Sequence, residues 1–228
     1  MSTVIIVPTL DEIDGIKNIM PKIKKDWVDR ILIVDGGSTD GTIEEAKKMG
    51  FKVVMQKQKG EFAGGHGTAF LQGVDATTSD NILLFSPDGN DEVEKIPELI
   101  EKIKEGYDQV LVTRFGKGSV NLDAGIVDTF GNKMFTFLVN CFFGGHWTDM
   151  LNGSRIISRK AFNELKYDAM GMDTTQQMSV RGLTRRQKIC EIIGNEGKRI
   201  GGKRKMHPLS TGASLSWGII KEFIFWNR

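Results

Sequence analysis

The residues best suited to chemistry lie in the segment 86–91, directly after the apolar run Asn-Ile-Leu-Leu-Phe at 81–85. Asp88 and Asn90 are oxygen donors two residues apart. Hard divalent ions such as Mg²⁺ and Mn²⁺ take a few oxygen ligands of this kind and keep positions open for phosphate oxygens. A departing diphosphate needs its charge neutralised in this way. The segment therefore indicates a metal site, although Asp-Gly is also an ordinary turn.

Polar residues also follow two earlier apolar runs. Segment 8–12 leaves the run at 4–7, and segment 35–42 leaves the run at 30–34. An Asp in such a place accepts hydrogen bonds from a base or a ribose hydroxyl, and glycines let a ligand approach the main chain. The alternative is a pair of tight turns with helix caps. A glycine-rich stretch around Gly67 opens a later helix, where backbone N–H groups suit an anion.

The spacing of apolar residues predicts alternating strands and helices up to residue 113. Strands are expected at 4–7, 30–34, 52–56, 81–85 and 109–113, and helices at 12–25, 38–49, 68–77 and 92–104. Later expected elements are helices at 127–143 and 174–186, a strand at 188–193 and an apolar helical stripe at 215–226. Continuous apolar strands between helices indicate an α/β fold with a mostly parallel central sheet flanked by helices. Ligands of such sheets bind beyond the carboxyl ends of the strands, where the polar segments lie.

Composition limits the class of protein. The chain has 228 residues, of which 39% are hydrophobic and 26% are charged, which excludes disordered and collagen-like chains. A net charge of +2 points to no partner, but stretch 181–205 is rich in Lys and Arg. Two cysteines cannot form a disulfide framework and favour a reducing compartment. Neither a signal peptide nor an apolar run of about 18–20 residues is visible, so we expect a cytoplasmic, soluble or peripheral protein.

Several spaced motifs together resemble glycosyltransferase family 2, which has the GT-A (nucleotide-diphospho-sugar transferase) fold, and within it the dolichol- or polyprenyl-phosphate mannosyltransferase-like branch. The motifs are VPTLDE at 7–12, IVDGGSTDGT at 33–42, GGHGTA at 64–69, SPDGN at 86–90, TRFGKG at 113–118, DMLNGSR at 149–155 and RIGGKRK at 199–205. They occur in the family's order. We therefore expect a GT-A glycosyltransferase domain over residues 1–206 and a C-terminal amphipathic helical tail over 207–228.

The resemblance implies roles for individual residues. Asp88, Asp149 and Arg199 would be catalytic, and Asp88 with Asn90 would hold Mg²⁺ or Mn²⁺. The substrate-binding residues would be Pro8, Glu12 and Asp35 at the nucleoside, Gly67 and Arg114 at the donor, Arg155 beside Asp149 at the acceptor, and Lys205 with Arg199 at phosphate.

The sequence also departs from the family's pattern. Ser86 replaces the first Asp of the family's Asp-x-Asp and removes one negative metal ligand. Gly36 replaces a second Asp, and Leu10 replaces a frequent Tyr. These departures favour a subfamily whose sugar or nucleotide differs from that of the mannose enzymes.

The reaction that the resemblance implies is an inverting transfer of a sugar from a nucleoside diphosphate sugar, GDP-mannose or UDP-hexose, to a polyprenyl or dolichyl phosphate. A lipid phosphate is already ionised and needs cationic positioning, which the basic stretch 181–205 supplies. Few aromatic residues are interleaved there, so nucleic acid is not expected as a partner.

Two alternatives remain open at this point. A transferase that acts on a sugar or small-molecule hydroxyl would need a general base, for which Asp149 and Asp91 are candidates. A degenerate member would bind nucleotide or membrane without turnover. The Phe-rich helix at 127–143 and the tail at 215–228 would contact the inner face of a membrane, or else form core or homodimer contacts.

Overall fold

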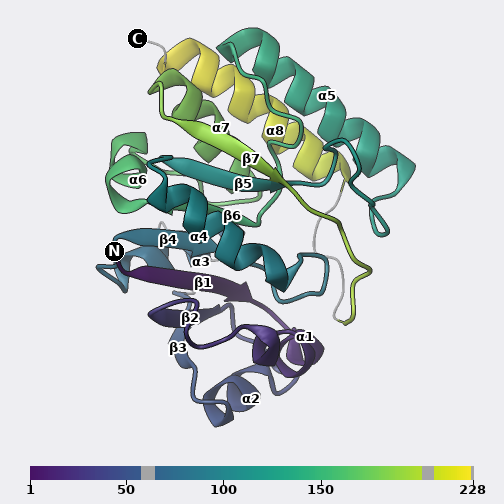
Figure 1. Cartoon of the computed structure of the whole chain (residues 1–228). Coiled ribbons are helices and arrows are strands. Elements are labelled where there is room, and N and C mark those ends of the chain that lie inside the picture. The colour runs from purple at the N-terminus through teal and green to yellow at the C-terminus, as the bar shows by residue number, and fades with distance from the viewer. Residues whose placement is uncertain (58–64, 202–207, 227–228) are drawn as a thin grey trace.

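A computed structural model describes residues 1–57, 65–201 and 208–226, and its central feature is one seven-stranded sheet (Figure 1). The strand order is β3-β2-β1-β4-β6-β5-β7. The strands are β1 (Thr3–Thr9), β2 (Arg30–Asp35), β3 (Lys52–Met55), β4 (Asn81–Leu84), β5 (Gln109–Thr113), β6 (Arg155–Ser158) and β7 (Ile189–Ile193). Strand β6 runs antiparallel to β4 and β5, and the other neighbouring pairs are parallel. The mostly parallel sheet expected from the sequence is confirmed.

Helices cover both faces of the sheet. They are α1 (Ile13–Asn18), α2 (Thr42–Lys48), α3 (His66–Asp75), α4 (Ile96–Lys104), α5 (Ile126–Phe143), α6 (Arg159–Leu165), α7 (Thr174–Thr184) and α8 (Pro208–Lys221). Helices α1, α2 and α4 pack on one face, and α3, α6 and α7 on the other. Helices α5 and α8 lie together at the β5 and β7 end, above the sheet in Figure 1.

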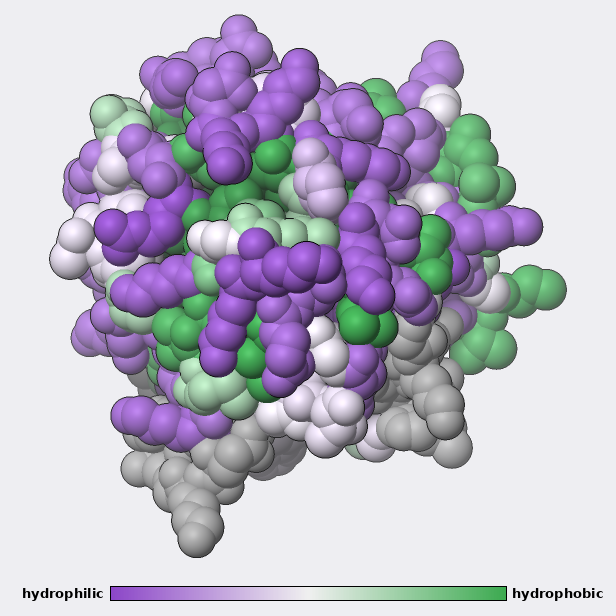
Figure 2. Space-filling view, turned by 90° about the horizontal axis from the view of Figure 1, so that it is seen from below, coloured by the Kyte–Doolittle hydropathy of each residue, from purple (hydrophilic) through white to green (hydrophobic). Residues whose placement is uncertain are grey.

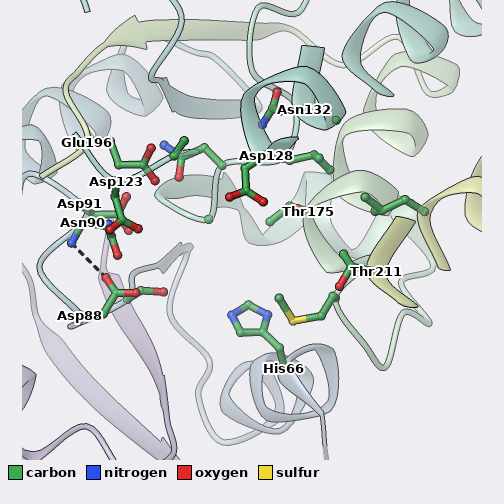
Figure 3. A pocket seen from close by; sticks show the side chains of 18 of the residues that line it. His66, Asp88, Asn90, Asp91, Asp123, Asp128, Asn132, Thr175, Glu196 and Thr211 are labelled. Atoms are coloured by element: carbon green, nitrogen blue, oxygen red, sulfur yellow. Dashed lines mark hydrogen bonds between the residues drawn. The ribbon is translucent and has the colours of Figure 1, made fainter. Parts of the chain in front are cut away.

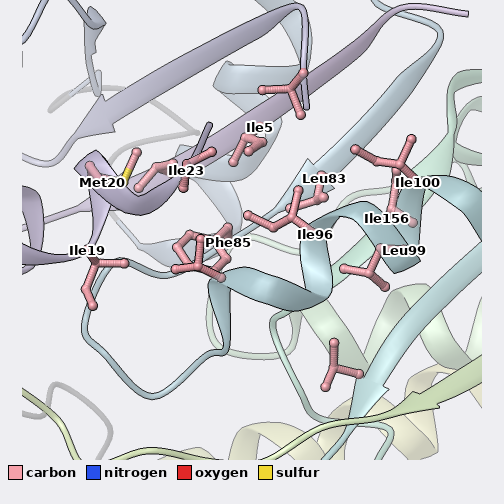
Figure 4. Packing of buried hydrophobic residues seen from close by; sticks show 14 of the residues in the cluster. Ile5, Ile19, Met20, Ile23, Leu83, Phe85, Ile96, Leu99, Ile100 and Ile156 are labelled. Carbon is pink, nitrogen blue, oxygen red and sulfur yellow. The ribbon is translucent and has the colours of Figure 1, made fainter. Parts of the chain in front are cut away.

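The core follows the two-residue period of a strand. In β1, Ile5 and Val7 face α1 and α4, whereas Val4 and Ile6 face α3, and all four are fully buried. Figure 4 shows the first of these clusters, in which Phe85, at the end of β4, packs among the isoleucines of α4 and the α1 region. Strands buried on both faces explain why their sequences are continuous apolar runs.

Two of the expected helices differ in their bounds from the prediction. The predicted helix 12–25 divides into α1 and the 3₁₀ turn Met20–Lys22, because Pro21 has no N–H to continue the α-helical ladder. Helix α2 begins only at Thr42, whose N–H donates to the Asp40 carboxylate at 2.9 Å. Ser38, at the expected start of this helix, lies outside α2 and donates its hydroxyl to Asp35. Helix α2 ends just before Gly50 (φ +82°), as expected.

The C-terminal helix packs against the rest of the molecule. Leu215 and Ile219 of α8 are buried with residues of α5 and α7, and the chain continues as the π-helix Glu222–Trp226. Glu222 forms a buried ion pair with Arg181 of α7 at 2.8 Å. The division into units 1–206 and 207–228 stays a prediction. None of the described helices combines the length and apolarity that a bilayer span requires.

Candidate active site

A pocket of about 1090 Å³ opens at the carboxyl ends of β1 and β4. The chain moves outward from β1 through β2 and β3 and then returns to the other side of β1 at β4, so this is the point where the strand order reverses. Glu12 and Asp88 stand at this end of the pocket. Its other walls come from α5, with Val127 and Phe130, and from α8, with Leu215. Figure 3 shows acidic side chains gathered at one end of this space.

Three residues predicted from separate motifs meet at the acidic end. Arg199 places Nη1 at 2.8 Å from Asp88 Oδ2 and Nη2 at 3.0 Å from Glu12 Oε1. The other oxygen of Asp88 accepts the N–H of Asn90 at 3.1 Å (Figure 3). The guanidinium therefore joins carboxylates that follow two neighbouring strands. Pro8 also lines this pocket.

The metal ligands expected from the sequence fit an ion that arrives with its substrate. Among residues 1–57, 65–201 and 208–226, no group of three or more His, Cys, Asp and Glu side chains is arranged to hold a metal. Mg²⁺ sites in transferases need only one or two carboxylates, because substrate phosphates and waters supply the remaining ligands. Asp88 and Asn90 both line the pocket and offer such a partial set. The Asn90 amide nitrogen is already engaged, since it donates to Gly197 O at 2.9 Å.

Arg114 presents the second positive charge on the pocket wall. Its Nε and Nη2 bind the two oxygens of Asp149 at 2.7 and 3.1 Å, and its Nη1 binds Glu196 Oε1 at 2.8 Å. Burial by itself would lower the pKa of Arg114, but the Asp149 and Glu196 carboxylates outweigh it and raise that pKa above its ordinary value. Arg114 therefore stays charged and fixed in direction.

Asp149 lies behind Arg114 and not on the pocket wall. Its side chain is fully buried, and its oxygens also accept the Asn132 amide at 2.8 Å and the Arg114 backbone N–H at 3.1 Å. A carboxylate saturated in this way has no oxygen to offer an acceptor. This placement corrects its expected position at the acceptor, because the Asp149 carboxylate is instead engaged by Arg114.

Arg155 is likewise removed from the pocket. Its guanidinium is buried and donates to the carbonyl oxygens of Met150, Asn152 and Thr175 at 2.8–3.0 Å. Burial lowers its pKa to about 10. Arg155 ties the 150–152 loop to α7, so its expected place beside the acceptor is corrected.

Asp35 and Gly67 also form hydrogen bonds within the protein and not with the pocket. Asp35 is fully buried and accepts the hydroxyls of Thr9 and Ser38 at 2.9 and 2.6 Å, so its carboxylate does not line the pocket. The N–H of Gly67 donates to Gly171 O at 3.1 Å, and a Cβ at Gly67 would lie 2.5 Å from Ala169 O. That N–H is therefore not available to an anion. Lys205 lies outside the described residues.

Glu196 and His66 also line the pocket, and Glu196 was assigned no site role from the sequence. Glu196 is buried, and its Oε2 has no hydrogen-bond partner among the described residues. It reaches Arg114 because β7 pairs with β5 and carries the following loop to the pocket. No sequence motif marks this position. Burial lowers the pKa of His66 to about 4, so its imidazole is neutral at pH 7.

Asp91 lies beside Glu196 at the same end of the pocket (Figure 3). The backbones of the two residues form an isolated antiparallel bridge. Burial, together with the negative charges of Asp88 and Glu196, raises the pKa of Asp91 to about 7, although Arg114 partly opposes the shift. Of the two bases considered from the sequence, only Asp91 faces the pocket.

The sequence of the chain is similar to those of known glycosyltransferases. The family model described as glycosyl transferase family 2 matches residues 4–166. Glycosyltransferase AglJ of Haloferax volcanii is 28% identical over 180 residues, covering 77% of this chain and 56% of AglJ, so the chain spans little more than half of that relative. Dolichyl-phosphate hexose transferase of the same organism is 25% identical over 95% of this chain and 92% of its own length.

Solved structures share the same fold. Glucosyl-3-phosphoglycerate synthase from Mycobacterium tuberculosis, crystallised with uridine diphosphate, superposes with a TM-score of 0.73 at 22% identity, over 98% of this chain and 79% of that chain. The GT-A fold implied by the motifs is thus confirmed. Because the family model covers well over half of the sequence, the chain belongs to glycosyl transferase family 2.

Proposed function

We propose that the protein is a glycosyltransferase that moves a sugar from a nucleoside diphosphate sugar, GDP-mannose or UDP-hexose, to a polyprenyl or dolichyl phosphate. The observation that carries this proposal is one pocket that joins the ionic end at Asp88 to apolar walls on α5 and α8. The relative named dolichyl-phosphate hexose transferase supports it, since it aligns over nearly its whole length.

The ionic end suits a diphosphate leaving group. Arg114 lines the pocket in a fixed orientation, and Arg199 lines the same pocket while paired with Asp88. A guanidinium can bind two phosphate oxygens at once and remains charged at any physiological pH. Asp88 and Asn90 would hold Mg²⁺ or Mn²⁺, which neutralises the growing charge of the diphosphate when it is bound. Structures of the mycobacterial synthase with Mn²⁺ and UDP-glucose support this expectation.

The acceptor end needs no proton transfer if the acceptor is a phosphate. An ionised phosphate oxygen attacks the anomeric carbon from the side opposite the leaving diphosphate, so the sugar is transferred with inversion and no base is consumed. The fully saturated Asp149 is consistent with such an acceptor. Val127, Phe130 and Leu215 line the rest of the space and suit an isoprenoid chain.

A hydroxyl acceptor is the second candidate, and Asp91 is the observation that favours it. A carboxyl on the pocket wall with a pKa of about 7 is matched to proton removal near neutral pH. The mycobacterial synthase of this fold has been crystallised with phosphoglyceric acid, a water-soluble compound.

The surface over α5 and α8 supports contact with a membrane. We define this apolar face by its exposed members, Ile126, Val127, Phe130, Phe137, Trp217, Ile220, Phe223, Ile224 and Phe225. Phe142 of α5 packs against Phe223 of the π-helix that continues α8, with ring centroids 5.5 Å apart. We place this face on the inner, cytoplasmic surface of a bilayer, where an acceptor lipid could enter the pocket. A homodimer through the same face is the competing arrangement.

A transfer assay with two acceptors tests the proposal. The protein is incubated with Mn²⁺ and radiolabelled GDP-mannose or UDP-glucose, together with either dolichyl phosphate in detergent or 3-phosphoglycerate. Label that moves into the organic phase supports the lipid phosphate. Label found only on the water-soluble acceptor supports the second candidate, with Asp91→Asn expected to abolish it.

A further inference from the structure

The segment 195–201, which we call the strap, crosses the acidic end of the pocket. Backbone hydrogen bonds fasten it to the turn after β4: Gly197 N donates to Asn90 O, and Ile200 N donates to Asp88 O, each at 2.9 Å. The Asn90 side chain returns a third bond to Gly197 O. The strap is therefore held to the residues that carry the Asp88 carboxylate.

Close packing at two glycines fixes how the strap lies. A Cβ at Gly197 would stand 2.7 Å from Gly89 O, and a Cβ at Gly89, whose φ is +88°, would stand 2.9 Å from Ile200. No larger residue fits either place without a shift of the backbone or of Ile200. Arg199 lies between Gly197 and Ile200 in the chain, so this packing directs its side chain at the carboxylates of Asp88 and Glu12.

Arg199 thus occupies the position of a counter-ion. Two carboxylates joined by one guanidinium would otherwise repel each other across a partly buried space. Arginine cannot lose its proton to relieve the arrangement, so its charge must either stay there or move. Its Nε is buried without a hydrogen-bond partner among the described residues. The side chain therefore has donor capacity that the two carboxylates do not use.

We propose that Arg199 is an internal counter-ion that competes with the divalent cation for Asp88, and that it turns from the carboxylates to the donor's diphosphate when the two bind together. This inference rests on the proposed function for the identity of the ligand. The guanidinium already occupies Asp88 Oδ2, and an ion held by Asp88 would be repelled by its positive charge, so the ion alone would bind against competition. A diphosphate removes that competition because it offers the guanidinium a bidentate partner. Cation and nucleotide then bind cooperatively.

Direct binding measurements separate this arrangement from a simple phosphate-binding arginine. Mn²⁺ binding is followed by electron paramagnetic resonance, first alone and then with UDP or GDP, for the native protein, Arg199→Gln and Arg199→Lys. Lys198→Gln is the matched control, because it removes the same charge from the neighbouring, exposed residue of the strap. Circular dichroism and thermal melting establish that each variant is folded.

Opposite changes in the two affinities are expected from Arg199→Gln. Mn²⁺ alone should bind about three- to tenfold more tightly, because its competitor is gone, and UDP or GDP should bind about tenfold more weakly. Lys198→Gln should leave Mn²⁺ affinity unchanged, and Arg199→Lys should lie between. Unchanged or weaker Mn²⁺ binding in folded Arg199→Gln overturns the proposal. If no form of the protein binds either nucleotide, the proposed function fails, whereas tighter Mn²⁺ binding in Arg199→Gln still supports the competition.

Discussion

The two ends of the pocket differ in which side chains they bury and which they expose. At the ends of β1, β2 and β4, charged side chains are wholly or partly buried and paired: Asp35 and Glu12 are buried, and Asp88 is partly buried. At α5 and α8 the reverse holds, because large apolar side chains such as Phe130 and Trp217 are 67% and 62% exposed. Figure 2, which looks from below the view of Figure 1, shows a surface dominated by hydrophilic residues with smaller hydrophobic patches between them.

The difference between these regions indicates what each one meets. Buried carboxylates are costly unless they are paired or bind a ligand, so their concentration at one pocket end points to a charged, polar substrate. An apolar face with this many exposed large side chains is unusual for a surface that meets only water. Under the proposed function, the first region would bind the donor and the second would meet a hydrophobic acceptor or surface. Four predictions would break or sharpen this contrast.

The largest effect is expected where the apolar region is anchored. Glu222→Ala leaves the guanidinium of Arg181, itself 1% exposed, without its nearest buried carboxylate, and should lower the free energy of unfolding by about 3–5 kcal/mol. Urea denaturation measures this loss. The neighbouring Lys221→Gln breaks only an exposed pair with Asp168 and should cost less than about 0.5 kcal/mol. Equal losses for the two variants would show that α8 is not held by the buried pair.

The next largest effect is expected at the ionic end. Asp88→Ala removes the carboxylate that would hold the cation at the donor's diphosphate, and it should reduce kcat/KM by about 10²–10³-fold. Steady-state transfer assays measure the rate, and circular dichroism checks the fold. An unaltered rate in a folded variant would show that Asp88 takes no part in the reaction. The ionic end of the pocket would then not be distinguished by its function from the apolar end.

A smaller effect concerns the pH dependence of stability. Burial raises the pKa of Asp91 from its ordinary value of 3.8 to about 7 in the folded protein, so the folded state holds the proton more tightly. Stability from this group is complete below pH 4 and is lost as pH rises to about 7. Because Asp91 keeps partial contact with solvent, we expect a loss of about 2 kcal/mol, less than the full shift would give.

Asp91→Asn should abolish this decline. Denaturation in buffers free of divalent ions, at pH 5 and pH 8, compares the variant with the native protein. If stability changes equally between pH 5 and pH 8 in the two proteins, the pKa of Asp91 is not raised in the folded state.

The smallest effect is expected on the apolar face. Phe130→Ser combined with Trp217→Ser should weaken binding to vesicles of phosphatidylcholine and phosphatidylglycerol about tenfold, because apolar area that would enter the bilayer is lost. Flotation measures the binding, and Met55→Ser, which changes an exposed apolar residue of β3, is the control. If the native protein ignores vesicles and sediments as a dimer that the double variant dissolves, the face is a protein interface.

The sequence predicted the frame of the site better than the state of its side chains. Apolar runs such as 81–85 specify strands, and the segments after them reach one edge, which is why Glu12, Asp88 and Arg114 line one pocket. Which carboxylates remain available depends on partners distant in the chain. Asp149 is saturated by Arg114 and by Asn132 of α5, a combination that no local pattern reveals.

Glu196 is the opposite case, a residue that lines the pocket although its sequence position did not predict it. It lies in a stretch rich in Lys and Arg, where a single acid has no distinctive spacing. Its role arises from the pairing of β7 with β5, which brings Ile193 opposite Thr113 and leads the next residues to Arg114. Chain topology, and not residue type, creates that contact.

The most direct test is the transfer reaction with the intact chain, Mn²⁺, a labelled nucleoside diphosphate sugar and dolichyl phosphate. A pocket that is ionic at one end and apolar at the other predicts a labelled glycolipid in which the sugar is joined to phosphate. Nucleotide sugar that binds at Asp88 while label never reaches a lipid, but does reach a water-soluble acceptor, would contradict this account.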